Sequence, residues 1–544
     1  MQQINNPGKE SIPFGRQLTL RALLLGIIGS AVITTSSMYV ALRIGSLPWP
    51  TIFVAVMSMA VLKILKRTNL NEINVAHTAM SAGSMVAGGL AFTIPGIWIL
   101  DKSAQVGLVP LLVVSLSGTL LGVLFTAYFR KFFIKEQKLP FPIGKAAAET
   151  VIAGDEGGGK AKTLFSSLGI TAVFVALRDG FKVIPAALSW PGLAAKNIFA
   201  GIMVSPMAFA IGTIIGPLYT GVWFVGAVLS HLLIVPVGIA AGWFPDLAAA
   251  NAFKDSLGIG LMIGTGLGIL VKGALSRAKG LFANLRRRKS SAPGLAVKLA
   301  PVILVTAAFL LTVFTRMGLL AGIITILGVW LTTAMAASIT GQTGINPMEI
   351  FGILVLLAVR ALTSAGMIEA FMVSGVVAVA CGLTGDVLND FKSGSILETN
   401  SRAQVIAEAS GGIVGAVVSV FVLLAMLKAF GEFGPGTELI APQAYAVSTM
   451  LKGLPNIPAF WIGLIIGCGL YVFNIPGMTL GLGVFLPMTI SAAVFSGGMI
   501  GLFLKKVIPP AKQNNTVSII AAGMLGGEGI AGVTIAIIKV VSIT

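Results

Sequence analysis

One glutamate, Glu528, lies in the apolar segment "AAGMLGGEGIAGV" at 521–533, among five glycines. A charged side chain at the centre of a bilayer costs about 2.5–3.5 kcal/mol on insertion scales. Burial also disfavours the ionised form, so a carboxyl group here could take up and release a proton. The neighbouring glycines, Gly527 and Gly529, would let a ligand or an opposing backbone approach closely. We therefore expect a proton-coupling role for Glu528 and a ligand contact at the two glycines.

Few other ionisable residues lie within apolar runs, and each is a functional candidate by default. Arg360 and Glu369 lie at the ends of two adjacent runs. Arg360 could bind a ligand and Glu369 a proton, or the two side chains could form a structural ion pair. His77 opens the third run, and Glu149 lies on one face of an amphipathic segment that could instead face water. We expect Glu369, His77 and Glu149 to share the proton-coupling role with Glu528, and Arg360 to contact the ligand.

The segment "GQTGINPM" at 341–348 is the second candidate site. Its glycines and proline cannot sustain a regular helix, so backbone groups are freed at this point. Together with the side chains of Thr343 and Asn346, the freed groups around Gly344 could bind a zwitterionic or chelated ligand. A tight loop at the membrane surface is the alternative.

The elements that carry these residues are those of a membrane protein. Of 544 residues, 56% are hydrophobic and only 10% are charged, and the mean hydropathy is +0.96. Apolar runs of about 20 residues, the length that crosses a bilayer, recur from Leu18 to Val541. They lack the alternation typical of barrel strands. The sequence therefore predicts an all-α polytopic membrane protein.

Charge sets the expected orientation. The net charge of +18 is concentrated in short segments between apolar runs, as the positive-inside rule predicts, so we expect no nucleic-acid partner. The N-terminal segment 1–17 and a basic loop at 272–298 are expected to be cytoplasmic. Arg178 and Lys182, late in the fifth run, are expected to extend to the membrane interface.

About 14–16 spans are expected, some of them broken or re-entrant. The runs lie near 18–42, 50–65, 76–99, 106–128, 163–183, 197–216, 221–242, 257–275, 298–315, 318–339, 349–366, 367–385, 409–428, 457–474, 479–503 and 516–541.

Weak internal repeats divide the chain into two halves, 18–297 and 298–544. The glycines of "IGLMIGTGLG" at 259–268 align with those of "AAGMLGGEGI" at 521–530, and Pro142 aligns with Pro442. Further pairs follow in the same order. Duplicated halves with helix breaks at matching places are typical of secondary transporters.

The ordered motifs "FPIGKAAAETVIAG", "GINPMEIFG", "APQAYAVSTMLKG", "GVFLPMTISAAVFSGGMI" and "AAGMLGGEGIAGV" resemble the oligopeptide transporter family over about residues 9–541. That family includes the yellow-stripe-like metal-chelate transporters, and this chain is similar to its prokaryotic members. The resemblance implies a proton-coupled symporter in the inner (cytoplasmic) membrane that imports short peptides or peptide-like metal chelates.

Other classes of function fit less well. No nucleotide-binding motif of a pump is present, and no H-E-x-x-H motif of a membrane metalloprotease. Asp386 and Asp390 are expected in a loop, which argues against aspartyl protease chemistry. We expect no enzyme, no cofactor and no metal site. A channel, an intramembrane enzyme and a homodimer are left open.

Overall fold

The computed structural model describes residues 12–44, 47, 51–156, 158–194, 197–286, 295–434, 437, 439–451, 454–507 and 510–541. This part of the chain is helical apart from turns and one short antiparallel pair of strands, β1 (Ala187–Ser189) and β2 (Gly201–Met203). The expected all-α fold is confirmed. Eight of the described helical segments are long and apolar enough to cross a membrane, which confirms a polytopic membrane protein. The count of 14–16 spans stays a prediction.

The helices have the following bounds. In the first part of the chain they are α1 (Phe14–Gln17), α2 (Leu20–Ile44), α3 (Thr51–Ile64), α4 (Leu70–Ala91), α5 (Gly96–Leu100), α6 (Leu108–Arg130), α7 (Pro142–Glu156), α8 (Gly158–Val175), α9 (Pro191–Ala194), α10 (Pro206–Ile215), α11 (Pro217–Val228), α12 (Val235–Ala240) and α13 (Leu247–Arg286). In the second part they are α14 (Leu295–Phe314), α15 (Leu319–Thr343), α16 (Met348–Leu362), α17 (Met367–Leu397), α18 (Ser401–Phe430), α19 (Pro442–Met450), α20 (Ile457–Val472), α21 (Gly477–Phe485), α22 (Met488–Val507) and α23 (Pro510–Val541). Three π-helical segments extend α6, α8 and α11: η1 (Lys131–Glu136), η2 (Ala176–Gly180) and η3 (Leu229–Ile234).

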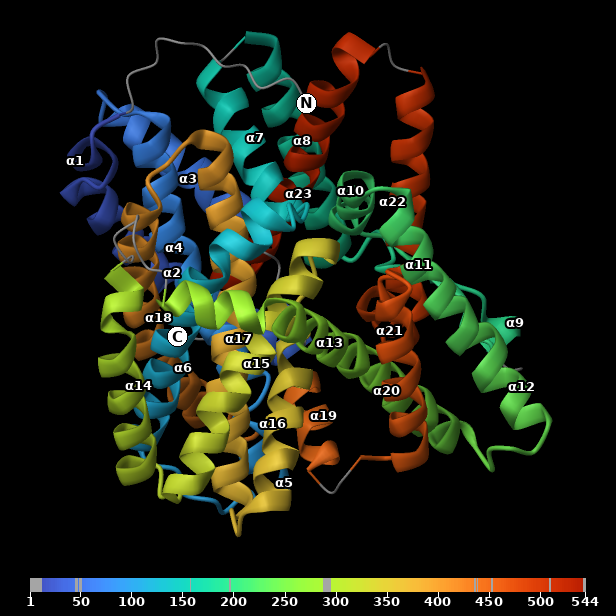
Figure 1. Cartoon of the computed structure of the whole chain (residues 1–544). Helices are drawn as coiled ribbons and strands as arrows, with labels where there is room; N and C mark the ends of the chain where they lie inside the picture. The colour runs from blue at the N-terminus through green and yellow to red at the C-terminus, as the bar shows by residue number, and fades with distance from the viewer. Residues whose placement is uncertain are drawn as a thin grey trace.

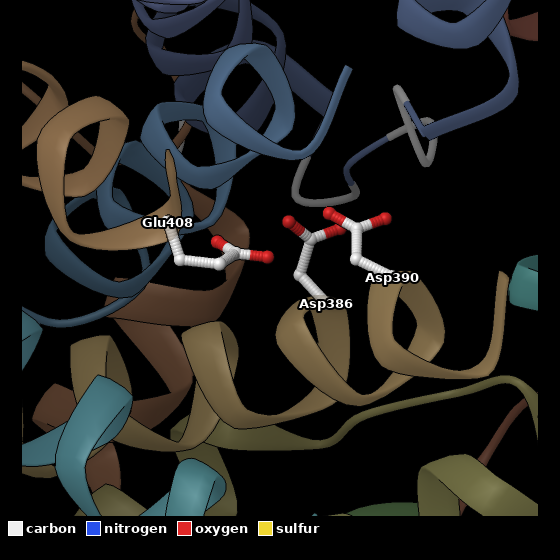
Figure 2. Close-up of side chains that lie close together, drawn as sticks. All are labelled: Asp386, Asp390 and Glu408. Carbon is white, nitrogen blue, oxygen red and sulfur yellow. The ribbon is translucent and has the colours of Figure 1, made fainter. Parts of the chain in front are cut away.

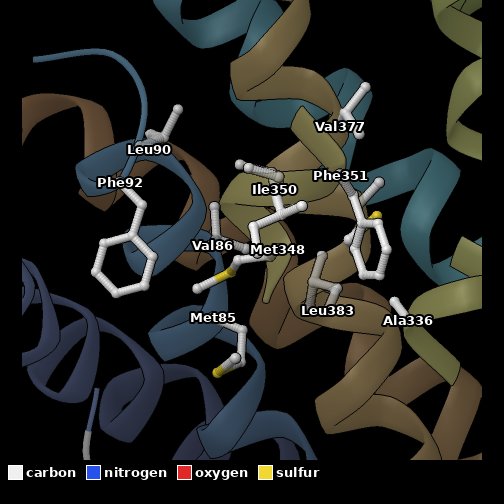
Figure 3. Packing of buried hydrophobic residues seen from close by; sticks show 14 of the residues in the cluster. Met85, Val86, Leu90, Phe92, Ala336, Met348, Ile350, Phe351, Val377 and Leu383 are labelled. Carbon is white, nitrogen blue, oxygen red and sulfur yellow. The ribbon is translucent and has the colours of Figure 1, made fainter. Parts of the chain in front are cut away.

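Two nearly fully buried helices, α4 and α17, form the centre of the bundle (Figure 1). α17 packs against α4, α6, α7, α15 and α16, and α18 covers α2, α4 and α6. The start of α16 is fixed in this core by Met348, whose side chain fits between Gly88 of α4 and Gly382 of α17 (Figure 3). Helices α11, α12, α20 and α21 extend from this bundle on the right of Figure 1.

The central helix is longer than its apolar run. The run ends near residue 385, yet α17 continues to Leu397, so Asp386 and Asp390 lie inside a helix and not in a loop. Both side chains are fully buried. The expectation of a loop was wrong because polarity marks solvent only when a residue faces it, and here α4 and α18 supply polar neighbours instead.

Glycines set the distance between several helix pairs. Gly260 and Gly264 of α13 meet backbone atoms of α20, and Gly463 and Gly467 of α20 meet backbone atoms of α13. A methyl group at Gly467 would lie 2.3 Å from the carbonyl oxygen of Leu261. Close approach of this kind increases dispersion contacts between helices, which is the main source of helix association in lipid.

A helix break occurs at the expected segment 341–348, and two further breaks end or interrupt apolar runs. α15 ends at Gly344, which adopts a left-handed conformation (φ +74°), and Gly216 (φ +85°) separates α10 from α11. The expected span 479–503 is broken at Leu486 and Pro487, between α21 and α22. The expected span 197–216 was wrong in its first part, because that part contains β2 and only 206–215 is helical.

Two equivalent hydrogen bonds support the proposed halves. The N–H of Phe141, just before α7, donates to the carbonyl oxygen of Gly341 near the end of α15 (2.9 Å). The N–H of Ala441, just before α19, donates to the carbonyl oxygen of Leu42 near the end of α2 (2.7 Å). The two donors also share a positive φ. The repeat itself stays a prediction.

The boundary between the halves differs from expectation. The predicted division at 297/298 falls within the first turn of α14, so a division would lie before Leu295. The predicted basic loop 272–298 is helical up to Arg286, where α13 ends, and 287–294 lie outside the described residues. Most of the predicted segment 1–17 also lies outside them.

The close approach of α13 and α20 predicts a position-specific effect of one methyl group. Gly467→Ala should lower the free energy of unfolding by about 1–3 kcal/mol, the usual cost of overpacking, measured in detergent. Gly469→Ala on the same helix is the matched control, because nothing lies within 4 Å of the added methyl group there. Equal stability of the two variants would contradict the predicted packing.

Candidate functional site

Glu528 of α23 is held by two other elements, η2 and α10. Its carboxylate accepts hydrogen bonds from Arg178 Nη2 of η2 (3.0 Å), from Ser205 Oγ (2.9 and 3.0 Å) and from the N–H of Met207 (2.7 Å). Ser205 caps α10, so the carboxylate lies at the N-terminus of that helix, where free N–H groups favour an anion. Glu528 is thus a compensated charge that links α23, η2 and α10.

Arg178 does not extend to the membrane interface as expected. Its guanidinium is 8% exposed, pairs with Asp179 (2.7 Å) as well as Glu528, and donates to the carbonyl oxygen of Val204. Two carboxylates and a carbonyl oxygen inside the protein satisfy its donors, so there is no gain in reaching water. Lys182, four residues later, is exposed.

The glycines next to Glu528 serve helix packing. A methyl group at Gly527 would lie 2.5 Å from the carbonyl oxygen of Leu168 in α8, and one at Gly523 would meet Ser167. Gly529 is buried. The contacts of Gly527 are with a helix, so its predicted contact with a ligand stays a prediction, as does that of Gly529.

The break between α15 and α16 lies inside the protein and not at a surface. The side chain of Asn346 donates from Nδ2 to the carbonyl oxygen of Cys381 in α17 (2.6 Å). Among the described residues its buried Oδ1 has no hydrogen-bond donor, and the buried hydroxyl of Thr340, six residues earlier in α15, has no partner. A buried acceptor without a partner costs free energy, and these atoms are therefore candidates for a ligand contact.

Thr343 and Gly344 shape this break. The Thr343 hydroxyl donates to the carbonyl oxygen of Ile339 and accepts from the N–H of Ile345, which closes a turn. The N–H of Gly344 donates to the carbonyl oxygen of Thr340 and ends α15. Their own polar groups are engaged within the turn, so they position Asn346, and their ligand contact stays a prediction.

The remaining predicted residues lie apart from one another. Arg360 is exposed and donates to the carbonyl oxygen of Leu451 (2.6 Å), while Glu369 is half-buried in the first turn of α17. An ion pair between these two is not found among the described residues. Glu149 is half-buried on α7.

His77 belongs to a cluster that the sequence did not reveal. Its Nε2 lies 2.9 Å from Oδ1 of Asp390, whose other oxygen accepts from Ser81 Oγ (2.8 Å). Asp386, one turn earlier on α17, accepts from Thr51 Oγ1 (3.1 Å), and Glu408 of α18 points toward both aspartates (Figure 2). We call Asp386, Asp390 and Glu408 the acid cluster.

All three members of the acid cluster lie just outside apolar runs, which is why they were missed. Asp386 and Asp390 follow the run that ends at 385, and Glu408 precedes the run that begins at 409. The one available signal was the spacing of the aspartates, since residues four apart lie on the same face of a helix. Nothing in the sequence places Glu408 opposite them.

Comparison with known proteins gives a consistent result. A family model described as "OPT oligopeptide transporter protein" matches residues 17–539. The chain is 26% identical to the "Putative oligopeptide transporter" of Haemophilus influenzae, with 93% of each chain covered. It is 22% identical to the metal-nicotianamine transporter YSL3 of Arabidopsis thaliana, covering 56% of this chain and 53% of that one. It is 23% identical to the metal-nicotianamine transporter YSL2 of the same plant over 35% of this chain and 32% of that one.

The ion pair of Arg178 and Glu528 predicts that the two side chains do not contribute independently to the free energy of unfolding. Arg178→Met should lower the free energy of unfolding by about 3–5 kcal/mol, because it leaves a buried carboxylate without its counter-charge. The double variant Arg178→Met/Glu528→Gln should recover most of that loss. Lys182→Met, which removes an exposed charge nearby, is the control, and additive effects in the double variant would disprove the coupling.

Proposed function

Because this chain belongs to the OPT oligopeptide transporter family, we propose that it imports short peptides across the cytoplasmic membrane by proton-coupled symport. Members of this family are transporters, and the chain is a transporter and not an enzyme. The proposal places segment 1–17 and the basic segment 272–298 on the cytoplasmic side. The positive-inside rule supports this orientation. Protons that move into the cytoplasm down their gradient would drive the uptake of peptide.

The contacts of Glu528 carry the proton-coupled part of the proposal. Its carboxylate joins α23, η2 and α10 through charge-assisted hydrogen bonds from Arg178, Ser205 and Met207. A protonated carboxyl group has no net charge to attract Arg178, and it would accept these hydrogen bonds less strongly. Uptake of one proton would therefore loosen α23 from the other two elements. A link that protonation breaks can couple a proton to a movement of helices.

Glu369 and Glu149 are secondary candidates for this role. Both are half-buried, so water can deliver protons to them. We place the main coupling role at Glu528 because its carboxylate joins α23 to two other elements, η2 and α10.

The break around Asn346 is the proposed contact for the substrate. A helix interruption at membrane depth, lined by freed backbone and amide groups, is where secondary transporters bind their ligands. Asn346 Oδ1 has no described donor, and a peptide N–H or an α-ammonium group would satisfy it. Arg360, which is exposed at the C-terminal end of α16, could attract the carboxylate of an arriving peptide.

Peptide-like metal chelates are the second candidate substrate. The observation that favours them is the similarity to the plant proteins, whose names state metal-nicotianamine transport. Such chelates also present carboxylates and amines, so the same break could bind them. Counter-flow separates both proposals from a channel, since only a carrier is accelerated by unlabelled substrate on the opposite side of the membrane.

Neutralising Glu528 should separate coupling from transport. In proteoliposomes, Glu528→Gln should abolish accumulation of a labelled peptide driven by an inward proton gradient, while exchange of the same peptide continues. The reason is that glutamine cannot take up and release the proton, although it keeps the shape of the side chain. Glu432→Gln, which removes an exposed carboxylate paired with Lys102, should behave like the unchanged protein. Proton-driven accumulation that survives in Glu528→Gln would refute the coupling role.

Truncating Asn346 should weaken substrate binding. One lost hydrogen bond is worth about 0.5–1.5 kcal/mol, so Asn346→Ala should raise KM about 2- to 10-fold. Uptake is measured with di- to tetrapeptides and with iron and nickel chelates in parallel, and Asn456→Ala, which removes only the cap of α20, is the control. The substrate whose KM rises is the one bound at the break. An unchanged KM for every substrate taken up would exclude Asn346 from the site.

A further inference from the structure

The acid cluster brings three carboxylates together deep inside the bundle. One oxygen from each of Asp386, Asp390 and Glu408 lies within 4.8 Å of the others, and all three side chains are fully buried. The two aspartates extend from successive turns of α17 in the same direction, and Glu408 reaches toward them from α18 (Figure 2). Three converging carboxylate groups without access to water require compensation by nearby positive charge or by donors.

The donors around the cluster do not suffice. Thr51 and Ser81 each donate one hydrogen bond to an aspartate. Three oxygen atoms of the cluster have no described partner, namely Oδ2 of Asp386 and both carboxylate oxygens of Glu408. These atoms are fully buried and directed into the cluster, and they therefore lack a positively charged or donating group.

Basic residues near the cluster are directed elsewhere. Among the described residues, His77 of α4 is the only basic side chain within ion-pair distance of it. Lys392 follows Asp390 by two residues but donates to the carbonyl oxygen of Leu139 before α7. Gln404 of α18 donates to the backbone carbonyl of Asp390 and so does not neutralise a carboxylate. At most one positive charge faces three carboxylates.

We propose that Asp386, Asp390 and Glu408 bind one hard divalent cation, of the Ca²⁺ or Mn²⁺ type, held within the bundle. Carboxylate oxygens are the preferred ligands of such ions. Ligands on opposite sides of Ca²⁺, at 2.3–2.6 Å from the ion, are about 5 Å apart, and the three oxygens already lie within that limit. Mg²⁺, with shorter and stricter bonds, would require the ligands to move closer.

His77 has a positioning role in this site. Its Nε2 contacts the carboxylate of Asp390, and a histidine–carboxylate contact of this type fixes the orientation of a metal ligand. On its other side α17 is attached to α7, where Asn389 Oδ1 accepts a hydrogen bond from the N–H of Gly144 (2.9 Å). The carboxylates of Asp386 and Asp390 are therefore held in place before an ion arrives, which favours binding.

This inference goes beyond the proposed function, because it concerns an ion bound by the protein and its test does not measure uptake. The purified full chain in detergent is treated with a chelator and titrated with MnCl₂, CaCl₂ and MgCl₂. Electron paramagnetic resonance reports bound Mn²⁺, and thermal unfolding reports Tm. We expect one saturable Mn²⁺ per chain, displaced by Ca²⁺, together with a higher Tm on binding.

Two variants make the result specific. Glu408→Gln should weaken Mn²⁺ binding at least about tenfold, and in the chelator-treated state it should unfold at a higher Tm than the unchanged protein, because one uncompensated carboxylate has been removed. Asp386→Asn should weaken binding as well. Glu349→Gln removes a buried carboxyl group of α16 outside the acid cluster and should bind Mn²⁺ like the unchanged protein.

Three results would overturn the proposal. One is the absence of saturable binding of any of the three ions. Another is binding that Glu408→Gln leaves unchanged, which would mark an adventitious ion on surface carboxylates. The third is a Tm that no ion raises but that increases as the pH falls, because protons would then be neutralising the cluster.

Discussion

The absence of water around buried charges is the constraint on which this structure depends. Inside a bilayer protein each charge must be compensated by other groups of the protein, because a desolvated ion without a partner costs several kcal/mol. Glu528 meets this condition with Arg178, the cap of α10 and a backbone N–H. The acid cluster does not meet it with the described groups alone. The two carboxylate sites thus differ in their electrostatics: the charge of Glu528 is compensated by nearby groups, and that of the acid cluster is not.

Helix packing makes both sites possible. Near Glu528, glycines at the contact of α8 with α23 allow the backbones to approach within a distance that a methyl group would prevent. The same close approach brings α4, α17 and α18 together around the acid cluster, since Gly411 of α18 lies against the backbone of Ala79 in α4. Close helix packing is therefore found at both buried carboxylate sites.

The central position of α17 connects the candidate sites. The carbonyl oxygen of Cys381 in this helix accepts a hydrogen bond from the side-chain amide of Asn346, and the next turn carries Asp386. The proposed substrate contact, Asn346, is thus bonded to the turn of α17 that precedes the proposed ion ligand Asp386. Glu528, by contrast, links α23 to η2 and α10, away from the contacts of α17. If the proposed coupling and substrate sites are correct, a movement of helices during transport involves both parts.

The membrane class, most of the helices, the break at 341–348 and the family could be predicted from the sequence alone. These follow from local properties, namely the length of apolar runs, the effect of Gly and Pro on the backbone, and ordered motifs. Glu528 could also be chosen as a candidate from the sequence, because a charge within an apolar run is visible locally; its coupling role stays a prediction. Its pairing with Arg178, 350 residues earlier, was not. The acid cluster and the length of α17 were decided by the tertiary structure, because whether a polar residue faces water or another helix depends on contacts between segments distant in the chain.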